Sequence, residues 1–248
     1  MALAVAWPLR AGERRELVVF AAASLRESFG EIAKIFERDH PGVVVSLALA
    51  GSQELRTQIE HGADADVFAS ADSKQVEPLV AAKLVDHPRI FARNEPVIVV
   101  PRANPAALTS LRDLPRAKRI VLGIPAVPIG AYALRVLDAA STRYGADFRA
   151  RVEARVVSRE VNVRQVLAKV TLGEADAAVV YRTDVASAGD AVEAIPIPPE
   201  LNVVADYPIT AVADAKHGAL AREFIDLVLS PAGQQILERF GFRPGNGV

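Results

Sequence analysis

Short apolar runs alternate with segments of helical periodicity along most of the chain. The first run, 17–20, reads Leu-Val-Val-Phe, which is typical of a strand buried on both faces. In the next segment, 25–36, apolar side chains recur at helical spacing between charged ones, as in an amphipathic helix. Further strands are predicted at 43–49, 66–69, 95–101, 119–124, 153–157, 177–181 and 203–213, and further helices at 53–60, 73–83, 131–144, 163–172, 219–229 and 231–240. This alternation with short connections predicts an α/β fold with parallel strands.

Four predicted strands lead into a predicted helix through small or polar residues. These junctions contain Ser24, Ser52, the turn 128–130, and the pair Asn162 and Val163. In a parallel sheet such junctions gather at the carboxyl edge, and each helix start offers unpaired amides at the positive end of the helix dipole. Several helix starts together can hold a small anion without a formal positive charge nearby. The pattern therefore predicts an anion site at this edge.

Two further side chains could complete such a site. Tyr181 ends a predicted strand and would supply a phenol, and Arg164 directly follows the helix start at Val163. Simpler structural interpretations also exist, with Ser24 as a helix cap, Tyr181 as a core tyrosine and Arg164 as a solvated or structural side chain. A site made only of donors suits a fully deprotonated tetrahedral dianion such as sulfate, molybdate or tungstate. It suits phosphate less, because the proton of hydrogen phosphate needs an acceptor.

Composition excludes several classes of function. The 248 residues include no cysteine, which excludes disulfides, thiolate zinc sites and cysteine nucleophiles. The formal net charge is −1, so the chain lacks the basic footprint of a nucleic-acid-binding protein. Each of the four histidines precedes Pro or Gly, and the nucleophile elbow, the P-loop and the Gly-x-Gly-x-x-Gly fingerprint are all absent. Common hydrolases and nucleotide-binding enzymes are therefore unsupported.

Two remaining features have modest weight. Asp64, Asp66 and Asp72 form the one acidic cluster, and because it lacks the regular spacing of an oxygen-ligand loop, we favour loop capping over a hard-cation site. The apolar opening segment, 1–10, contains small-residue triplets and looks like the end of a secretory signal, with an N-terminal extension as the alternative. Residues 11–15 are a polar lead into the first strand.

Eight short motifs follow one another along nearly the whole chain, namely Phe20–Leu25, Gly51–Leu55, Gly62–Phe68, Val127–Tyr132, Val163-Arg164, Val179–Tyr181, Tyr207–Ile209 and Phe240–Phe242. In this order they resemble the motifs of the molybdate-binding proteins of bacterial ABC importers, the ModA family. The resemblance implies the type II periplasmic binding protein fold, which is an α/β fold of two lobes joined by two crossover segments. Each lobe is expected to be a mostly parallel sheet flanked by helices. We expect 15–98 to begin lobe 1, 99–207 to form lobe 2, and 208–248 to return to lobe 1.

The resemblance also implies a function and a site. It implies an extracytoplasmic, periplasmic receptor that captures molybdate, and tungstate too, and delivers it to a membrane permease. It implies a monomer without catalytic residues, cofactor or nucleic-acid partner. By position, the family's ligand-binding residues correspond to Ser24, Ser52, Ile129, Val163 and Tyr181. The serines would use hydroxyl and amide, Ile129 and Val163 their backbone amides, and Tyr181 its phenol, with no direct bond from protein to molybdenum.

Two departures from the family and three alternatives accompany this interpretation. Ile129 replaces a smaller alanine, and Asn162 stands where an aspartate is common. The alternatives are a receptor for another oxyanion such as sulfate, an enzyme on the same scaffold, and a cytoplasmic sensor that uses the fold. The lack of a plausible base near Ser24 argues against the enzyme, and the lack of a helix-turn-helix segment at either end argues against the sensor.

Overall fold

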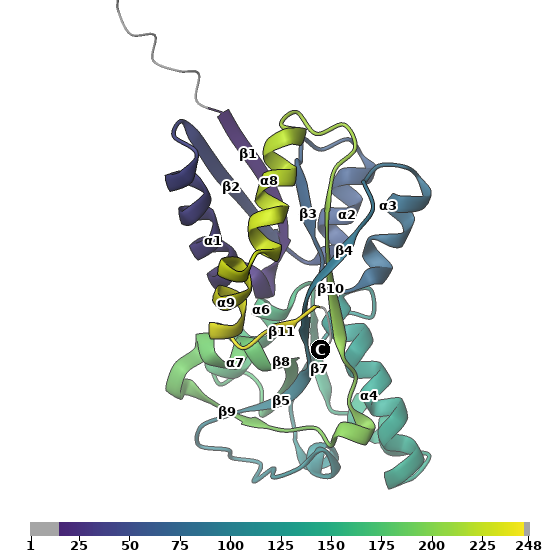
Figure 1. Cartoon of the computed structure of the whole chain (residues 1–248). Coiled ribbons are helices and arrows are strands. Elements are labelled where there is room, and N and C mark those ends of the chain that lie inside the picture. Colours follow the sequence, from purple (N-terminus) through teal and green to yellow (C-terminus); the bar gives the residue numbers. More distant parts are fainter. Residues whose placement is uncertain (1–14, 246–248) are drawn as a thin grey trace, which may run out of the picture.

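The computed structural model describes residues 15–245 and places them in two α/β lobes, each built on one sheet (Figure 1). The expected signal remnant, 1–10, lies outside the described residues. Within 15–245, no helix combines the length and the apolar character that a membrane span needs.

The first lobe contains a six-stranded sheet with the order β11-β4-β10-β3-β1-β2. Its strands are β1 (Arg15–Ala22), β2 (Val43–Ala50), β3 (Val67–Ala69), β4 (Arg89–Asn94), β10 (Ala205–Ala211) and β11 (Arg243–Pro244). Its helices are α1 (Arg26–Asp39), α2 (Ser52–Glu60), α3 (Glu77–Ala81), α8 (Gly218–Leu229) and α9 (Pro231–Arg239). In Figure 1, α1, α8 and α9 lie on one side of this sheet, and α2 and α3 lie on the other.

The second lobe contains a five-stranded sheet with the order β7-β6-β8-β5-β9. Its strands are β5 (Pro96–Pro101), β6 (Ile120–Gly123), β7 (Val156–Glu160), β8 (Ala177–Tyr181) and β9 (Val192–Ile195). Its helices are α4 (Pro128–Tyr144), α5 (Phe148–Glu153), α6 (Val163–Thr171) and α7 (Arg182–Ala188). Short 3-10 helices occur in both lobes: η1 (Ala23–Leu25) and η2 (Ser73–Gln75) in the first, and η3 (Leu111–Arg116), η4 (Gly189–Ala191) and η5 (Pro199–Leu201) in the second.

The two-lobed α/β fold is confirmed, but the sheets are mixed and not mostly parallel. Strand β1 pairs in parallel with β2 and β3, and β6 pairs in parallel with β7 and β8. On the other side of each sheet the pairing is antiparallel, through β10 in the first lobe and β5 in the second. The difference arises because the strand that follows each change of lobe, β5 or β10, runs antiparallel to both of the strands beside it.

The chain passes between the lobes at Glu95, which separates β4 from β5, and again in the segment 202–204 before β10. The expected boundaries after 98 and after 207 therefore fall inside β5 and β10. Strand β5 pairs with β8 and β9, and β10 pairs with β3 and β4. Ladder pairing thus keeps each strand in a single lobe, and the crossings are the short links between strands.

Several element predictions differ from the structure. Helix α4 begins at Pro128, earlier than the predicted start at 131, because proline is well suited to the first turn of a helix. The strand predicted at 153–157 is wrong in its first part, since α5 continues to Glu153 and β7 starts at Val156. Elements β4, α5, α7, β9 and β11 were not predicted. Strand β4 carries arginine at two of its six positions, and the others are short and do not show a clear apolar period.

The amino end of α4 approaches the end of β6 so closely that only glycine fits. A Cβ atom added at Gly130 would lie 2.1 Å from the carbonyl oxygen of Ile124 and 2.6 Å from that of Gly123. These are backbone atoms, which cannot rotate away as a side chain could. Gly130 therefore sets the distance between the start of α4 and the sheet.

We expect Gly130→Ala to lower the free energy of unfolding by about 1–3 kcal/mol, because the added methyl must displace backbone. The matched control is Gly30→Ala in α1, where an added Cβ would meet nothing within 4 Å. That change should be neutral or stabilising by up to about 1 kcal/mol, since alanine favours helix more than glycine does. Urea denaturation of both variants makes the comparison, and equal stability of the two would contradict it.

Candidate functional site

The strand–helix junctions of both lobes meet at one cavity between the lobes. Lobe 1 lines it with 22–24, 50–52 and Ala71, and lobe 2 lines it with 127–129, 162–163 and Tyr181. All five residues that the sequence singled out are in this lining, namely Ser24, Ser52, Ile129, Val163 and Tyr181. The structure thus brings them together, and their role in binding is still a prediction.

The cavity is small and carries no charged side chain in its lining. Its volume is about 10 Å³, which is close to the smallest space that can hold one water molecule. Hollows of about 430 and 440 Å³ also occur in the described part of the chain, but both lie away from the strand–helix junctions. The lining, with neutral donors and no charged side chain, suits a small anion, and in this closed conformation the cavity has no room for an organic solute of metabolite size.

Ser52 lies at the start of α2 with its hydroxyl in the cavity lining. The side chain is 1% exposed, and its Oγ accepts a hydrogen bond from the amide of Ala71 at 3.0 Å. Because that amide occupies one lone pair of the hydroxyl, the proton of Ser52 is available for an acceptor in the cavity. The neighbouring Gly51 lets the lobes approach, since a Cβ there would lie 2.4 Å from the carbonyl oxygen of Val161.

Ser24 does not cap a helix, contrary to the simpler interpretation. It lies within η1, while α1 begins at Arg26 and has no side-chain cap. Its Oγ lies 3.0 Å from the phenol oxygen of Tyr207, and both residues are buried. The hydroxyl therefore serves a contact between η1 and β10 and not the first amides of α1.

Tyr181 ends β8 and is 1% exposed, yet its phenol oxygen has no hydrogen-bond partner within the described residues. Burial raises the pKa of the phenol well above its usual value of 10, so the group keeps its proton near neutral pH. A buried hydroxyl without a partner is costly. Tyr181 also lines the cavity, so its phenol is a donor available at this site.

Backbone donors come from the starts of α4 and α6. Ile129 and Val163 belong to the first turns of these helices, where amides have no acceptor within the helix. The departure at Asn162 is conservative, because its side chain accepts from the amide of Gln165 at 3.0 Å and caps α6. The departure at Ile129 places a larger side chain in the core, where it is fully buried.

Arg164 has a structural role in this conformation. Its guanidinium pairs with Glu27 of α1 at 2.5 Å and with Asp184 of α7 at 3.1 Å. Asp184 also accepts from the amide of Tyr181 at 3.2 Å. The cation is therefore engaged by two carboxylates and links α6 of the second lobe to α1 of the first.

Two glutamine side chains add contacts between the lobes. The Nε2 of Gln53 in α2 donates to the carbonyl of Val161 at 2.8 Å. The Nε2 of Gln75 donates to the carbonyl of Ala126 at 3.2 Å. Together with the Arg164–Glu27 pair, these bonds show that the two lobes are closed against each other around the cavity.

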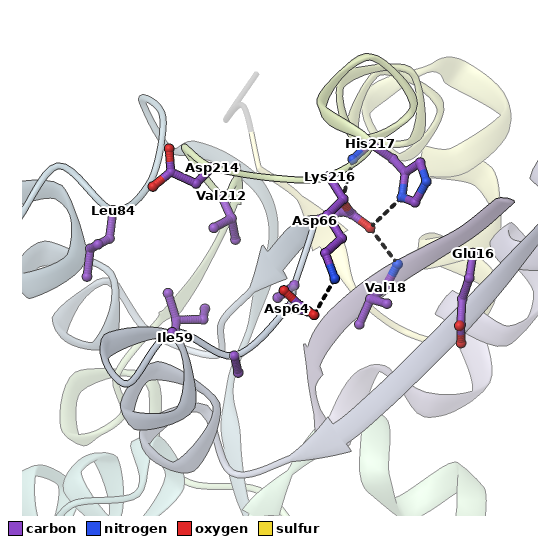
Figure 2. Close-up of a pocket in the computed structure, with 13 residues that line it drawn as sticks. Glu16, Val18, Ile59, Asp64, Asp66, Leu84, Val212, Asp214, Lys216 and His217 are labelled. Atoms are coloured by element: carbon purple, nitrogen blue, oxygen red, sulfur yellow. Dashed lines mark hydrogen bonds and ion pairs between the residues drawn. The ribbon is translucent and has the colours of Figure 1, made fainter.

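The acidic cluster ties loops together. Figure 2 shows the side chain of Asp66 facing Val18 and His217, whose amides donate to its two oxygens at 2.8 Å each, and Asp64 pairing with Lys216. Asp72 caps η2 by accepting from an amide at 3.0 Å. Across residues 15–245, no group of three or more acidic, histidine or cysteine side chains is arranged to hold a metal ion.

Comparison with known proteins places the chain in a family. The family model for bacterial extracellular solute-binding proteins matches residues 17–243. A molybdate-binding protein ModA of Mycobacterium tuberculosis is 40% identical over 230 residues, which cover 92% of this chain and 84% of that protein. The chain belongs to the ModA family of bacterial extracellular solute-binding proteins. The resemblance seen in the sequence motifs is thereby confirmed.

Solved structures agree on the fold of this ModA-family protein. The periplasmic molybdate-binding protein of Azotobacter vinelandii superposes with a TM-score of 0.79 at 20% identity, covering 91% of this chain and 98% of that one. A sulfate-binding protein of Mycobacterium tuberculosis superposes with a TM-score of 0.84 at 20% identity, covering 93% and 87%. At this identity both comparisons establish the two-lobed fold and leave the ligand open.

Two residues beside the site received no role from the sequence. Tyr207 and Asn94 lie near the links between the lobes, and both are buried. Tyr207 contacts Ser24, and Asn94 contacts Tyr207. Tyr207 was noticed only as part of a motif. The tyrosine followed by proline in a predicted extended segment was the one available signal, and Asn94, at the end of a strand rich in arginine, gave none.

Asp72 provides a test of the burial around the site. Burial raises the pKa of this carboxyl from 3.8 to about 6. The folded protein therefore holds this proton more tightly than the unfolded chain, so the stability from Asp72 is present below about pH 4 and is lost as the pH rises through about 6.

Asp72→Asn should remove this pH dependence while keeping an oxygen acceptor for the η2 amide. We expect the free energy of unfolding of the unmodified protein, relative to that of the variant, to fall by about 2–3 kcal/mol from pH 4 to pH 7. Urea denaturation across this range measures it. A difference between the two proteins that stays constant with pH would show that the carboxyl titrates normally.

Proposed function

We propose that the protein is an extracytoplasmic receptor that captures molybdate, and tungstate as well, and delivers it to the permease of an ABC importer. The observation that carries this proposal is the composition of the cavity, which gathers hydrogen-bond donors and no charged side chain between two closed lobes. The unpartnered, buried phenol of Tyr181 gives the clearest sign that an acceptor belongs there. The 40% identity to a molybdate-binding protein supports the choice of cargo.

The donors favour a ligand that only accepts hydrogen bonds. The hydroxyls of Ser24, Ser52 and Tyr181 and the helix-start amides of Ile129 and Val163 would surround its oxygens. A tetrahedral dianion that is fully deprotonated at neutral pH offers acceptors on every side. Hydrogen phosphate also carries a proton, and the lining offers no carboxylate to receive it.

Lobe closure would report that the ligand is bound. The bonds from Gln53, Gln75 and Arg164 cross between the lobes, so they exist only when the lobes are together. A ligand that binds both lobes shifts the population toward this closed form. The permease would recognise that form, and the lack of an imidazole or carboxylate in the lining fits a carrier and not an enzyme.

A sulfate receptor is the second candidate, because the same donor set accommodates any tetrahedral dianion. A sulfate-binding protein superposes with a TM-score of 0.84, so this fold also serves sulfate binding. The two candidates differ in cargo and share the site.

Thermal unfolding with added anions tests the cargo. Molybdate or tungstate at 100 times its dissociation constant should add about 2.7 kcal/mol to the stability of the folded form. For a chain of this size we expect the midpoint to rise by about 5–10 °C. Sulfate and phosphate at equal concentration should shift it little. A shift with sulfate alone would show that sulfate, and not molybdate, is the ligand. No shift with any anion would overturn the proposed function.

Tyr181→Phe tests the site itself. Removing the phenol should weaken molybdate binding by about 10–100-fold, because a donor to a buried, charged acceptor contributes about 1–3 kcal/mol. Tyr144→Phe is the matched control, since Tyr144 lies at the far end of α4 from the cavity. Isothermal titration calorimetry measures both variants. Unchanged affinity in Tyr181→Phe would remove this residue from the site.

A further inference from the structure

A buried chain of hydrogen bonds reaches the cavity from the link between the lobes. The Nδ2 of Asn94 donates to the phenol oxygen of Tyr207 at 3.4 Å, and that oxygen lies 3.0 Å from the Oγ of Ser24. The three residues are 4%, 0% and 3% exposed. Asn94 ends β4 and Tyr207 lies early in β10, so the chain of bonds starts where the polypeptide passes between the lobes and ends at Ser24.

The neighbours of Asn94 fix the direction of these hydrogen bonds. Its Oδ1 accepts from the amide of Glu95 at 2.9 Å, which identifies the other end of the side chain as the donor. The two protons of Nδ2 then go to Thr183 Oγ1 at 2.8 Å and to Tyr207. The Tyr207 oxygen therefore accepts a hydrogen bond from Asn94, and the Tyr207 hydroxyl proton is left to donate one.

The Ser24 hydroxyl oxygen is the acceptor within reach of the Tyr207 hydroxyl proton. If Ser24 donated to Tyr207 instead, the phenol proton would be buried without an acceptor among the described residues, which is unfavourable. With Tyr207 donating, one lone pair of the Ser24 hydroxyl is occupied, and the serine proton is directed to the cavity that Ser24 lines. The arrangement parallels Ser52, whose hydroxyl is held in the same sense by the amide of Ala71.

We propose that Tyr207 is a positioning residue for the anion site, which orients the Ser24 hydroxyl as a donor and thereby favours a fully deprotonated oxyanion over one that carries a proton. This inference rests on the proposed function. It also gives a role to the Tyr207-Pro208-Ile209 motif, none of whose residues lies in the cavity lining.

Two further observations support this role. The ring of Tyr207 packs against the rings of Tyr181 and Phe242, with centroids 5.7 and 5.4 Å apart. This packing holds the phenol in place without help from the hydrogen bonds. Burial also raises the pKa of Tyr207 well above its usual range, so the phenol keeps the proton that it donates to Ser24.

Tyr207→Phe removes the hydroxyl and leaves the ring packing intact. We expect it to weaken molybdate binding about tenfold, as for the loss of one oriented donor. In a Ser24→Ala background the same change should weaken binding less than twofold, because Tyr207 acts through the serine. Isothermal titration calorimetry on the two single variants and the double variant completes the cycle. Tyr144→Phe is again the control and should change nothing.

The double-mutant cycle separates positioning from a general structural effect. A tenfold loss in both backgrounds, or no loss in the first, would overturn the role of Tyr207. Thermal unfolding without ligand accompanies each variant, so that a loss of folded protein is seen directly. If the unmodified protein binds none of the four oxyanions, the proposed function fails, whereas normal binding by the unmodified protein with an additive cycle refutes only this inference.

Selectivity is the second readout. With Tyr207→Phe the Ser24 hydroxyl is free to turn and accept a hydrogen bond from the proton of hydrogen phosphate. We therefore expect the ratio of phosphate to molybdate that displaces half of the bound molybdate to be about tenfold lower for the variant than for the unmodified protein. This corresponds to one hydrogen bond gained and one lost. Phosphate that competes no better in the variant, or does not compete at all at the highest concentration used, would remove the claim that Tyr207 contributes to selectivity.

Discussion

A buried hydrogen-bond donor without an acceptor among the described residues, the phenol of Tyr181, is the constraint on which the proposed function depends. It lines one cavity together with Ser24, Ser52 and the first turns of α4 and α6, whose hydroxyls and amides are further donors. A buried donor without an acceptor costs about 1–3 kcal/mol. Under the proposed function, an acceptor in the cavity would therefore favour the closed form and link ligand binding to the position of the lobes.

The fold allows these donors to converge because backbone approaches backbone where the elements meet. Gly51 of the first lobe faces the carbonyl of Val161 in the second, and Gly130 faces the carbonyls at the end of β6. Side chains at these positions would hold the two lobes, or α4 and its sheet, further apart. Small residues thus shape the cavity, while serine, tyrosine and the helix starts supply its chemistry.

The proposed selectivity would follow from the absence of a charged side chain in the cavity lining. Arg164, which follows Val163 of the lining, is paired with Glu27 and Asp184 and so supports closure. Neutral donors with fixed directions would distinguish anions by whether they carry a proton, whereas a cation would attract every anion in its neighbourhood. The proposed orientation of the Ser24 hydroxyl by Tyr207 would extend this principle to a residue outside the cavity lining.

Much of the fold and all of the proposed site residues follow from the sequence. Local patterns predicted the strands β1, β2 and β8 and the junctions at Ser24, Ser52 and Val163, because buried strands and helix starts have characteristic residue patterns within a few positions. The strands and helices with weak periodicity, such as β4 and α5, show no such pattern. The antiparallel half of each sheet also escaped prediction, since strand direction depends on where the chain returns.

Only the tertiary structure decided how the site works. Ser24 and Tyr207 are 183 positions apart in the sequence, and nothing local indicates that one orients the other. The direction of a hydroxyl proton depends on which atoms surround it within about 3 Å, and those atoms come from distant segments. The sequence by itself therefore determined which groups could bind an anion, and the packing of the two lobes decided which atoms lie close enough to orient their protons.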